Sequence, residues 1–176
     1  MKLTLKTCTV RSWEWRDRDA IVRYANNRKV SINLRDRFPY PYTARDARNW
    51  LDMVVDQNPE TNFAIEVGDE AIGGIGFTPQ YDVGRRSAEI GYWLGEPFWG
   101  RGITADAVQL LSVYAFETCN MLRLFALPFA DNLQSIRVLE KAGYTREAIL
   151  RSSSVKSGVM RDQALYARIN EAWRGV

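Results

Sequence analysis

Residues 87–117 most constrain the fold, because they combine a strand, a glycine-bearing loop and a helix in one short stretch. Residues 87–94 (SAEIGYWL) predict a strand, since the aromatic side chains near its end favour extended backbone. Residues 95–102 (GEPFWGRG) contain three glycines and a proline, which predicts a loop. From residue 103 the apolar residues recur at the spacing of an amphipathic helix. The sequence therefore predicts a turn from a strand directly into a helix N-terminus.

A loop of this kind is suited to bind an anion. The first amides of a helix lack internal acceptors, the helix dipole adds partial positive charge, and glycine lets a ligand approach the backbone. A tight turn without a ligand is the alternative. Two known phosphate loops are excluded: Arg101 and Gly102 replace the lysine and hydroxyl residue of a P-loop. Gly74 and Gly76 begin a Rossmann pattern, but Pro79 stands at its third glycine.

The strings EIGYWL (89–94) and FWGRGI (98–103) resemble the acetyl-CoA loop of the GNAT N-acetyltransferases, and most closely the RimJ/RimL-like branch. The string NLQSIRVLEKAGY (132–144) is similar to a second segment of that family, and the two lie in the expected order and separation. The resemblance extends loosely over residues 3–169. Trp99 is usual for this branch, whereas Thr104 departs from the small residue at the end of the family's loop.

The resemblance implies one domain over residues 1–176 with an α+β fold. It implies a mixed, largely antiparallel sheet of six to seven strands with helices on both faces. The residue pattern also favours α+β, because helices come first, then an antiparallel meander, then strands alternating with helices. A final hairpin closes the chain.

The expected elements follow from local patterns. Three glycines at residues 73, 74 and 76 indicate a bulge or a close packing contact in their strand. Thr43 and Asp46 predict a capping box, and Asp131 is the expected cap of the helix after residue 131, with Gln134 as its box partner. We expect strands at 2–10, 63–67, 71–79, 87–94, 122–127, 144–155 and 159–169, and helices at 16–24, 28–35, 43–56, from 103, and from 132 to Gly143.

Acetyl-CoA is the co-substrate that the resemblance implies, with no metal. Backbone amides from Gly100 to Thr104 would meet the pyrophosphate, strand amides from Tyr92 to Leu94 would pair with the pantetheine arm, and Asn132 would touch the CoA. Helix capping is the alternative for Asn132. The expected cofactor-binding residues are Tyr92, Trp93, Leu94, Trp99, Gly100, Arg101, Gly102, Ile103, Thr104 and Asn132.

Glu89 is the expected general base, because it is an acid in an otherwise apolar strand beside the loop and many members of the family use a glutamate on this strand. A structural ion pair with a residue such as Arg86 is the alternative. Ser135 matches the family position near the leaving thiolate, with a role as a helix-turn serine as the alternative.

Three aromatic residues are expected to wall the acceptor pocket, since the family builds that pocket partly from its N-terminal helices. They are Phe38, Tyr40 and Tyr42. The alternative is that these rings pack on the core from a surface loop. The acceptor is expected to be a protein N-terminus or a small-molecule amine.

Composition excludes several classes of function. The chain has no histidine, which removes histidine triads and histidine metal sites. Cys8 and Cys119 form no metal or redox pattern and are expected to be separate reduced thiols. No apolar run is long enough to span a membrane and no signal peptide is evident, so we expect a cytoplasmic protein, a monomer or homodimer, without membrane or nucleic-acid partners.

Charge is distributed unevenly along the chain. The net charge is +3, but residues 1–50 alone contain twelve Lys and Arg against five Asp and Glu. A solvated basic face is one interpretation, and contact with an anionic substrate or an acidic peptide is the other.

The sequence as a whole predicts an acetyl-CoA-dependent N-acetyltransferase that works by direct attack. A CoA-binding sensor without turnover and an unrelated nucleotide-binding domain are the rival hypotheses.

Overall fold

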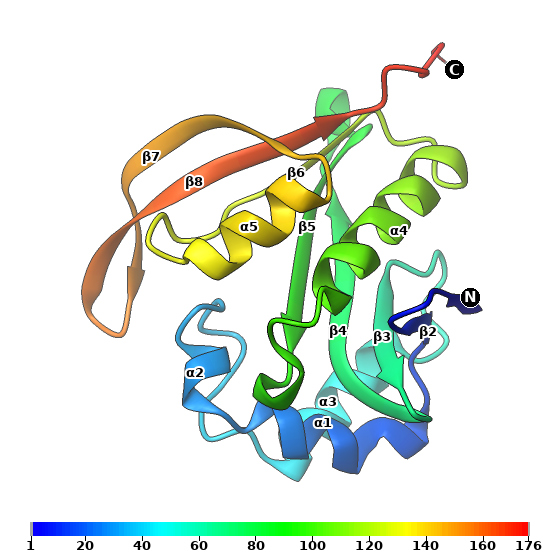
Figure 1. Cartoon of the computed structure of the whole chain (residues 1–176), viewed down its shortest axis with the longest axis vertical. Helices are drawn as coiled ribbons and strands as arrows, with labels where there is room; N and C mark the ends of the chain where they lie inside the picture. The colour runs from blue at the N-terminus through cyan, green and yellow to red at the C-terminus, as the bar shows by residue number, and fades with distance from the viewer. Residues whose placement is uncertain (1, 176) are drawn as a thin grey trace. The chain divides into compact units, whose positions relative to one another are not determined.

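The strand, loop and helix of residues 87–117 form with the predicted bounds in the computed structural model, which describes residues 2–175 (Figure 1). They are β5 (Ser87–Leu94), the short 3-10 helix η3 (Glu96–Phe98) and α4 (Ile103–Glu117). The described residues divide into two units. The first unit contains residues 2–76 and Tyr92–Ala107. The second unit contains Phe77–Gly91 and residues 108–175.

Antiparallel strands form the sheet of the first unit. They are β1 (Lys2–Thr4), β2 (Thr9–Ser12), β3 (Asn62–Val67) and most of β4 (Glu70–Pro79). Val10 of β2 lies opposite both Leu3 of β1 and Ile65 of β3. The prediction of one strand over residues 2–10 is wrong, because the chain turns between β1 and β2, where the amide of Leu5 donates to the carbonyl oxygen of Cys8 at 2.8 Å.

Besides η3 and the start of α4, the first unit contains four helical segments: the 3-10 helix η1 (Trp15–Asp17), α1 (Arg18–Ala25), α2 (Arg28–Ser31) and α3 (Ala44–Val54). The predicted capping box of α3 is confirmed, since the Thr43 hydroxyl accepts from the Asp46 amide and the Asp46 carboxylate accepts from the Thr43 amide. Asn26 ends α1 as predicted, but α2 stops four residues before the predicted Arg35.

The apolar faces of α1 and α3 pack on the sheet of the first unit in one core cluster. Ile21 and Leu51 are fully buried there, and burial of side chains of this size is the main favourable contribution to folding. The buried members of the cluster are Trp13, Ala20, Ile21, Ala25, Tyr42, Ala47, Leu51, Val54, Ala64 and Ala71.

A long hairpin dominates the second unit, formed by β7 (Thr145–Lys156) and β8 (Val159–Ile169), which run side by side as curved ribbons in Figure 1. β8 also pairs antiparallel with β6 (Arg123–Ala126), and β6 pairs parallel with the start of β5. The unit contains α5 (Leu133–Lys141) and the 3-10 helix η2 (Asp82–Gly84) as well. Gly143 follows α5 with φ +84°, which confirms its predicted place after the helix.

The predicted cap of α5 is off by one residue. Asn132, and not Asp131, is the N-cap, and its side-chain oxygen accepts from the amide of Ser135 at 3.2 Å. Asp131 instead forms an ion pair with Arg161 of β8. Both side chains suit a cap, so the residue types alone do not select between them.

Through residues 2–175 the hydrogen-bonded strand order is β1-β2-β3-β4-β5-β6-β8-β7. The fold is therefore α+β with a largely antiparallel sheet, as predicted, but with eight described strands in place of six to seven. The difference is explained in part by the split of residues 2–12 into β1 and β2, which the alternating pattern does not reveal.

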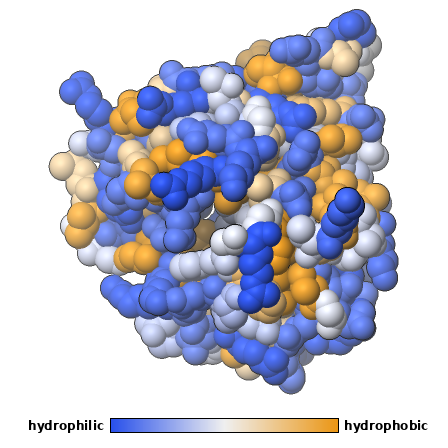
Figure 2. Space-filling model, viewed as in Figure 1, coloured by the Kyte–Doolittle hydropathy of each residue, from blue (hydrophilic) through white to orange (hydrophobic). Residues whose placement is uncertain are grey.

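Hydrophilic residues cover most of the face seen in Figure 2, with hydrophobic residues scattered between them. Within residues 2–175, no helix is both long and apolar enough to cross a membrane. Both cysteines are free thiols, as predicted, with Cys8 buried and Cys119 partly buried.

Candidate functional site

The glycine loop, residues 95–102, is held in shape by its own hydrogen bonds. The amide of Gly95 donates to the carbonyl oxygen of Ile72 at 2.8 Å, which anchors the loop start on β4. The indole nitrogen of Trp99 donates to the carbonyl oxygen of Leu94 at 2.7 Å. These bonds fold the loop back on the ends of β4 and β5, and Trp99 is one of the residues that hold it there.

Two glycines in the left-handed region lead into α4. Gly100 has φ +76° and Gly102 has φ +81°, a conformation that disfavours any residue with a side chain. No atom lies within 4 Å of the place where either would carry a Cβ, so the backbone here is open. The first helical bond runs from the Asp106 amide to the Gly102 carbonyl oxygen at 3.1 Å. The amides that follow Gly102 have no acceptor within the helix and form a ready site for an anion.

Arg101 lies between these glycines with an exposed side chain. Its Nη2 donates to the carbonyl oxygen of Pro97 at 2.8 Å, and its guanidinium lies 5.3 Å from the centre of the Phe98 ring. The side chain is therefore fixed on the loop itself, with its charge beside the open backbone. Its predicted contact with a phosphate stays a prediction.

Glu96 ties the loop to the start of α2. Its carboxylate forms an ion pair with Lys29 and accepts a hydrogen bond from Nδ2 of Asn27 at 2.7 Å. The hydrogen bond from Lys29, followed by that from Asn27, lowers the pKa of Glu96 below its ordinary value. Because Asn27 also caps α2, one carboxylate connects the helix start with the loop.

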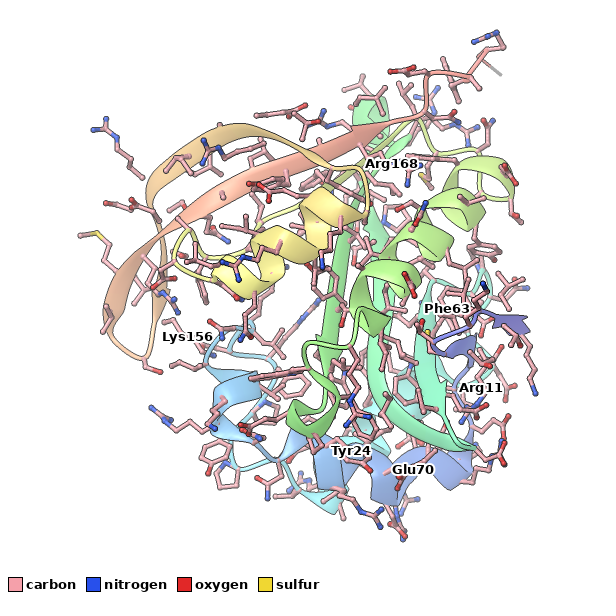
Figure 3. The ribbon with its side chains drawn as sticks, viewed as in Figure 1. Arg11, Tyr24, Phe63, Glu70, Lys156 and Arg168 are labelled. Carbon is pink, nitrogen blue, oxygen red and sulfur yellow. The ribbon has the colours of Figure 1, made fainter. Side chains whose placement is uncertain are left out.

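Tyr24 of α1 packs directly against the loop. A Cβ at Gly95 would lie 2.9 Å from Cδ1 of the tyrosine ring, so only glycine fits there without a shift. The Tyr24 ring also meets Phe98 edge to face, with 5.4 Å between the ring centres. Figure 3 shows Tyr24 beside Glu70, to which its hydroxyl donates at 2.7 Å. That hydrogen bond raises the pKa of Tyr24.

A pocket of about 400 Å³ opens beside these contacts. Its lining comes from the end of α1, the start of α2 and η3. The lining residues are Arg23, Tyr24, Asn26, Asn27, Glu96 and Pro97. None of these was predicted as a site residue, because the contacts join residues 46 to 69 positions apart and leave no local signal in the sequence.

The end of β5 lies very close to the glycines of β4. A Cβ at Gly73 would be 2.5 Å from the carbonyl oxygen of Trp93, and one at Gly74 would be 2.7 Å from the indole nitrogen of Trp93. The predicted close packing contact is confirmed. The register also shifts between Ile65 and Glu66 on the paired strand β3, so a strand irregularity is present as well.

Phe38 connects the segment between α2 and α3 with β5, since its ring centre lies 5.6 Å from that of Trp93. It also lies 4.9 Å from the ring of Tyr42, which is only 6% exposed and belongs to the core. Burial raises the pKa of Tyr42 to about 12. Tyr40 is 48% exposed. Tyr42 belongs to the core cluster and Phe38 packs against it, and acceptor roles for Phe38, Tyr40 and Tyr42 remain predictions.

The remaining predicted residues lie in the second unit. Glu89 is partly buried on β5 opposite Phe125, between the buried residues Ala88 and Ile90, so it points to the other face of the strand. Arg86, its suggested partner, donates to the carbonyl oxygen of Asn120 at 3.4 Å. Asn132 and Ser135 are joined by the capping bond of α5. The side-chain oxygen of Asn132 accepts the capping hydrogen bond, and the N–H donors of the same side chain take no part in it.

The structure thus places the predicted residues in two groups. The loop residues from Tyr92 to Thr104 stand with Phe38 and Tyr42 in the first unit, and Glu89, Asn132 and Ser135 stand in the second. The described residues 2–175 contain no cluster of three or more acidic or cysteine side chains that could hold a metal ion.

Known proteins match this chain over most of its length. A sequence profile described as the acetyltransferase (GNAT) domain matches residues 8–145. An uncharacterized N-acetyltransferase, p20 of Bacillus licheniformis, is 31% identical over 173 residues, which are 95% of each chain. The ribosomal-protein-serine acetyltransferase of Escherichia coli is 36% identical over 108 residues, which are 61% of this chain and 59% of that one.

Solved structures agree on the fold. RimL, the ribosomal L7/L12 alpha-N-protein acetyltransferase, solved in complex with coenzyme A, superposes with a TM-score of 0.87 over 98% of this chain and 99% of its own, at 22% identity. The profile covers more than half of the chain, and both motifs lie within the matched residues. The chain is therefore an acetyl-CoA-dependent acyltransferase that belongs to the GNAT family, and its relatives are consistent with the RimJ/RimL-like branch.

Proposed function

We propose that this protein transfers the acetyl group of acetyl-CoA to the α-amine at the N-terminus of a peptide or protein. The observation that carries the proposal is the pair of left-handed glycines, Gly100 and Gly102, open to solvent and directly before α4. Such a backbone presents several amides to one anion, and the pyrophosphate of CoA is the anion that this family places there.

The cofactor is held mainly by backbone. The amides from Gly100 to Thr104 bind the pyrophosphate, and the exposed guanidinium of Arg101 adds a charge-assisted contact. Strand amides between Tyr92 and Leu94 pair with the pantetheine arm, which positions the thioester at the end of β5. Asn132 contributes its amide donors to the CoA while its oxygen caps α5.

Transfer proceeds by direct attack of the amine. The amine nitrogen forms a bond to the acetyl carbon, the carbon–sulfur bond breaks, and its electron pair leaves with the CoA sulfur. Glu89 accepts the proton that the nitrogen loses, directly or through water. An α-amine has a pKa near 8 and a lysine side chain near 10.4, so the α-amine is more easily deprotonated and is the favoured acceptor.

Two groups assist the acyl centre. A backbone amide near Leu94 that does not pair with the pantetheine arm donates to the oxyanion that forms during attack. The hydroxyl of Ser135 donates a hydrogen bond to the departing sulfur, which is a good leaving group because a thiol has a pKa near 8.5. The names of the ribosomal-protein relatives support a protein acceptor, and Phe38 and Tyr40 lie on the segment that would border it.

The test is a steady-state assay with acetyl-CoA and a peptide that begins with serine, with the same peptide blocked at its N-terminus as the control. Released CoA thiol and the peptide mass are measured, and a panel of small amines is run in parallel. We expect CoA release only with the unblocked peptide. Release with small amines alone would contradict the protein acceptor, and CoA binding without release from any amine would instead indicate a sensor.

A matched pair of variants tests the base. Glu89→Gln removes the proton acceptor, and we expect kcat to fall about 10²- to 10⁴-fold with little change in acetyl-CoA affinity. Glu117→Gln makes the same change at an exposed residue at the end of α4 and should leave kcat unchanged. An unchanged kcat in Glu89→Gln would assign the proton to another acceptor.

A further inference from the structure

The strongest concentration of positive charge near the glycine loop is the basic segment, residues 28–37 (RKVSINLRDR). It contains four cations and one acid, a surplus of three positive charges in ten residues. All five charged side chains are exposed. In Figure 2 the surface over α2, which begins this segment, is mostly hydrophilic. The charge surplus of residues 1–50 is therefore partly gathered in one short stretch.

Two of the four cations are not neutralised. Lys29 is paired with Glu96, but neither Arg28 nor Arg37 has an acidic partner within residues 2–175. The Arg28 guanidinium lies 5.9 Å from the centre of the Tyr40 ring, and that ring is itself exposed. An arginine beside an exposed aromatic ring, and a second arginine within the same segment, form a surface that attracts carboxylates.

The basic segment is fixed to the transfer site at both of its ends. At its start, Asn27 and Lys29 bind Glu96, which belongs to the glycine loop and lies four residues before Gly100. Just after its end, Phe38 contacts Trp93 on β5, where the thioester is proposed to lie. All of these residues belong to the first unit. These contacts hold the segment that carries Arg28 and Arg37 beside the glycine loop and the end of β5.

We propose that the basic segment selects acceptors whose first residues after the terminal amine include Asp or Glu. This inference rests on the proposed function and names its acceptor class. Arginine binds carboxylates in a forked geometry, and unpaired surface charge also steers acidic chains toward the site. The cations have a second effect, because positive charge near an amine favours its neutral form, which is the form that attacks. A surplus of only three charges fits a short acidic segment better than a nucleic acid.

The test compares three peptides of equal length that begin with serine. They carry two glutamates, two glutamines or two lysines at the third and fifth positions. At low salt we expect kcat/KM to be about tenfold higher for the glutamate peptide than for the glutamine peptide, with the lysine peptide lowest. The difference should shrink as salt is raised, because the charges are exposed.

Charge reversal gives the decisive comparison. Arg37→Glu and Arg28→Glu each lower the surplus from three to one and should narrow the glutamate preference. The double variant has a surplus of one negative charge, so the lysine peptide should become the better substrate, a gain that an unfolded protein does not produce. The control variant Arg18→Glu makes the same charge change at the start of α1 and should keep the wild-type order. The eight residues of α1, about 12 Å in length, separate Arg18 from the helix end that lies beside the glycine loop.

The outcomes separate the two proposals. Equal kcat/KM for all three peptides, or a glutamate preference that persists in the double reversal variant, would overturn the acidic acceptor while the transferase stands. Stronger competition by a single-stranded RNA than by the acidic peptide would also overturn it, in favour of nucleic acid. Absence of CoA release with every peptide would instead contradict the proposed function itself, and the acidic acceptor with it.

Discussion

The indole nitrogen of Trp99 donates a hydrogen bond of 2.7 Å to the carbonyl oxygen of Leu94. This bond joins the last residue of β5 to the residue before the first left-handed glycine, Gly100. The glycine loop is therefore closed by its own chain before any ligand binds. A binding site that is already in shape loses less conformational entropy when the cofactor arrives.

Trp99→Phe tests this closure, because it keeps an aromatic ring and removes the donor. A neutral hydrogen bond contributes about 1 kcal/mol, so we expect acetyl-CoA affinity to fall about fivefold. Calorimetric titration measures the change. Trp15→Phe, at an exposed residue of η1, is the control and should bind like the wild type. Equal affinity in Trp99→Phe would mean that the bond does not shape the site.

Gly102→Ala tests the left-handed backbone. A residue with a side chain costs about 1–2 kcal/mol in this region, which corresponds to up to roughly 30-fold weaker acetyl-CoA binding if the loop relaxes away from its shape. Gly68→Ala is the matched control, because Gly68 has φ +60° in the β3–β4 turn and, like Gly102, has no atom within 4 Å of its Cβ position. Similar losses of affinity in both variants would show a general effect of strain.

A buried charge cluster supports the first unit. Arg11 is 3% exposed and binds the carboxylates of Asp17 and Glu66. The hydrogen bonds that Arg11 donates to Asp17 are the main cause that raises the pKa of the arginine. Arg11 is labelled in Figure 3. Arg11→Ala leaves two buried carboxylates without their partner, so we expect the free energy of unfolding to fall by about 3–5 kcal/mol.

Urea unfolding of Arg11→Ala checks that value against Arg18→Ala. Arg18 pairs with Asp19 at an exposed site, and its loss should cost less than about 1 kcal/mol. If the two variants unfold at the same urea concentration, the buried cluster does not stabilise the unit.

The capping box of α3 predicts a dependence of stability on pH. Hydrogen bonds from Thr43, first from its hydroxyl, lower the pKa of Asp46 below its ordinary value of 3.8. A lowered folded-state pKa means that the stabilisation is complete above pH 3.8 and is lost as pH falls through the folded value. Asp46→Asn should therefore cost about 0.5–1 kcal/mol near pH 7, and this cost should shrink as pH falls through the folded pKa of Asp46.

Urea unfolding of wild type and Asp46→Asn at several pH values measures this convergence. Asp52→Asn, an exposed change near the end of the same helix, is the control. A difference that stays constant down to about pH 2 would mean that the Asp46 charge has no part in capping.

Elements with strong local signals were predicted well from the sequence. β5 and the start of α4 have the predicted bounds, because a strand rich in aromatic residues, a glycine loop and a helical period follow one another directly. The β7–β8 hairpin is marked equally well by its turn. The split of β1 and β2 was missed, because residues 2–10 alternate without a break and the turn at residues 5–8 leaves no glycine or proline.

Contacts between distant residues explain most of what the sequence did not reveal in the site. Glu96 with Lys29, and Tyr24 with Glu70, join separate helices and strands. Neither pair has a spacing that a helix or strand period would expose. The loop residues, in contrast, were predicted because their chemistry depends on consecutive backbone groups. The roles of Glu89 and Ser135 depend on where a bound substrate lies, so they stay predictions.

The most direct test is calorimetric titration of the purified protein with acetyl-CoA, with ATP and NAD as controls. We expect saturable binding of one acetyl-CoA per chain and no comparable heat from either nucleotide, since the glycine loop lacks both the P-loop and the Rossmann pattern. Acetyl-CoA binding no stronger than that of ATP and NAD would contradict the cofactor assignment and the transfer mechanism built on it.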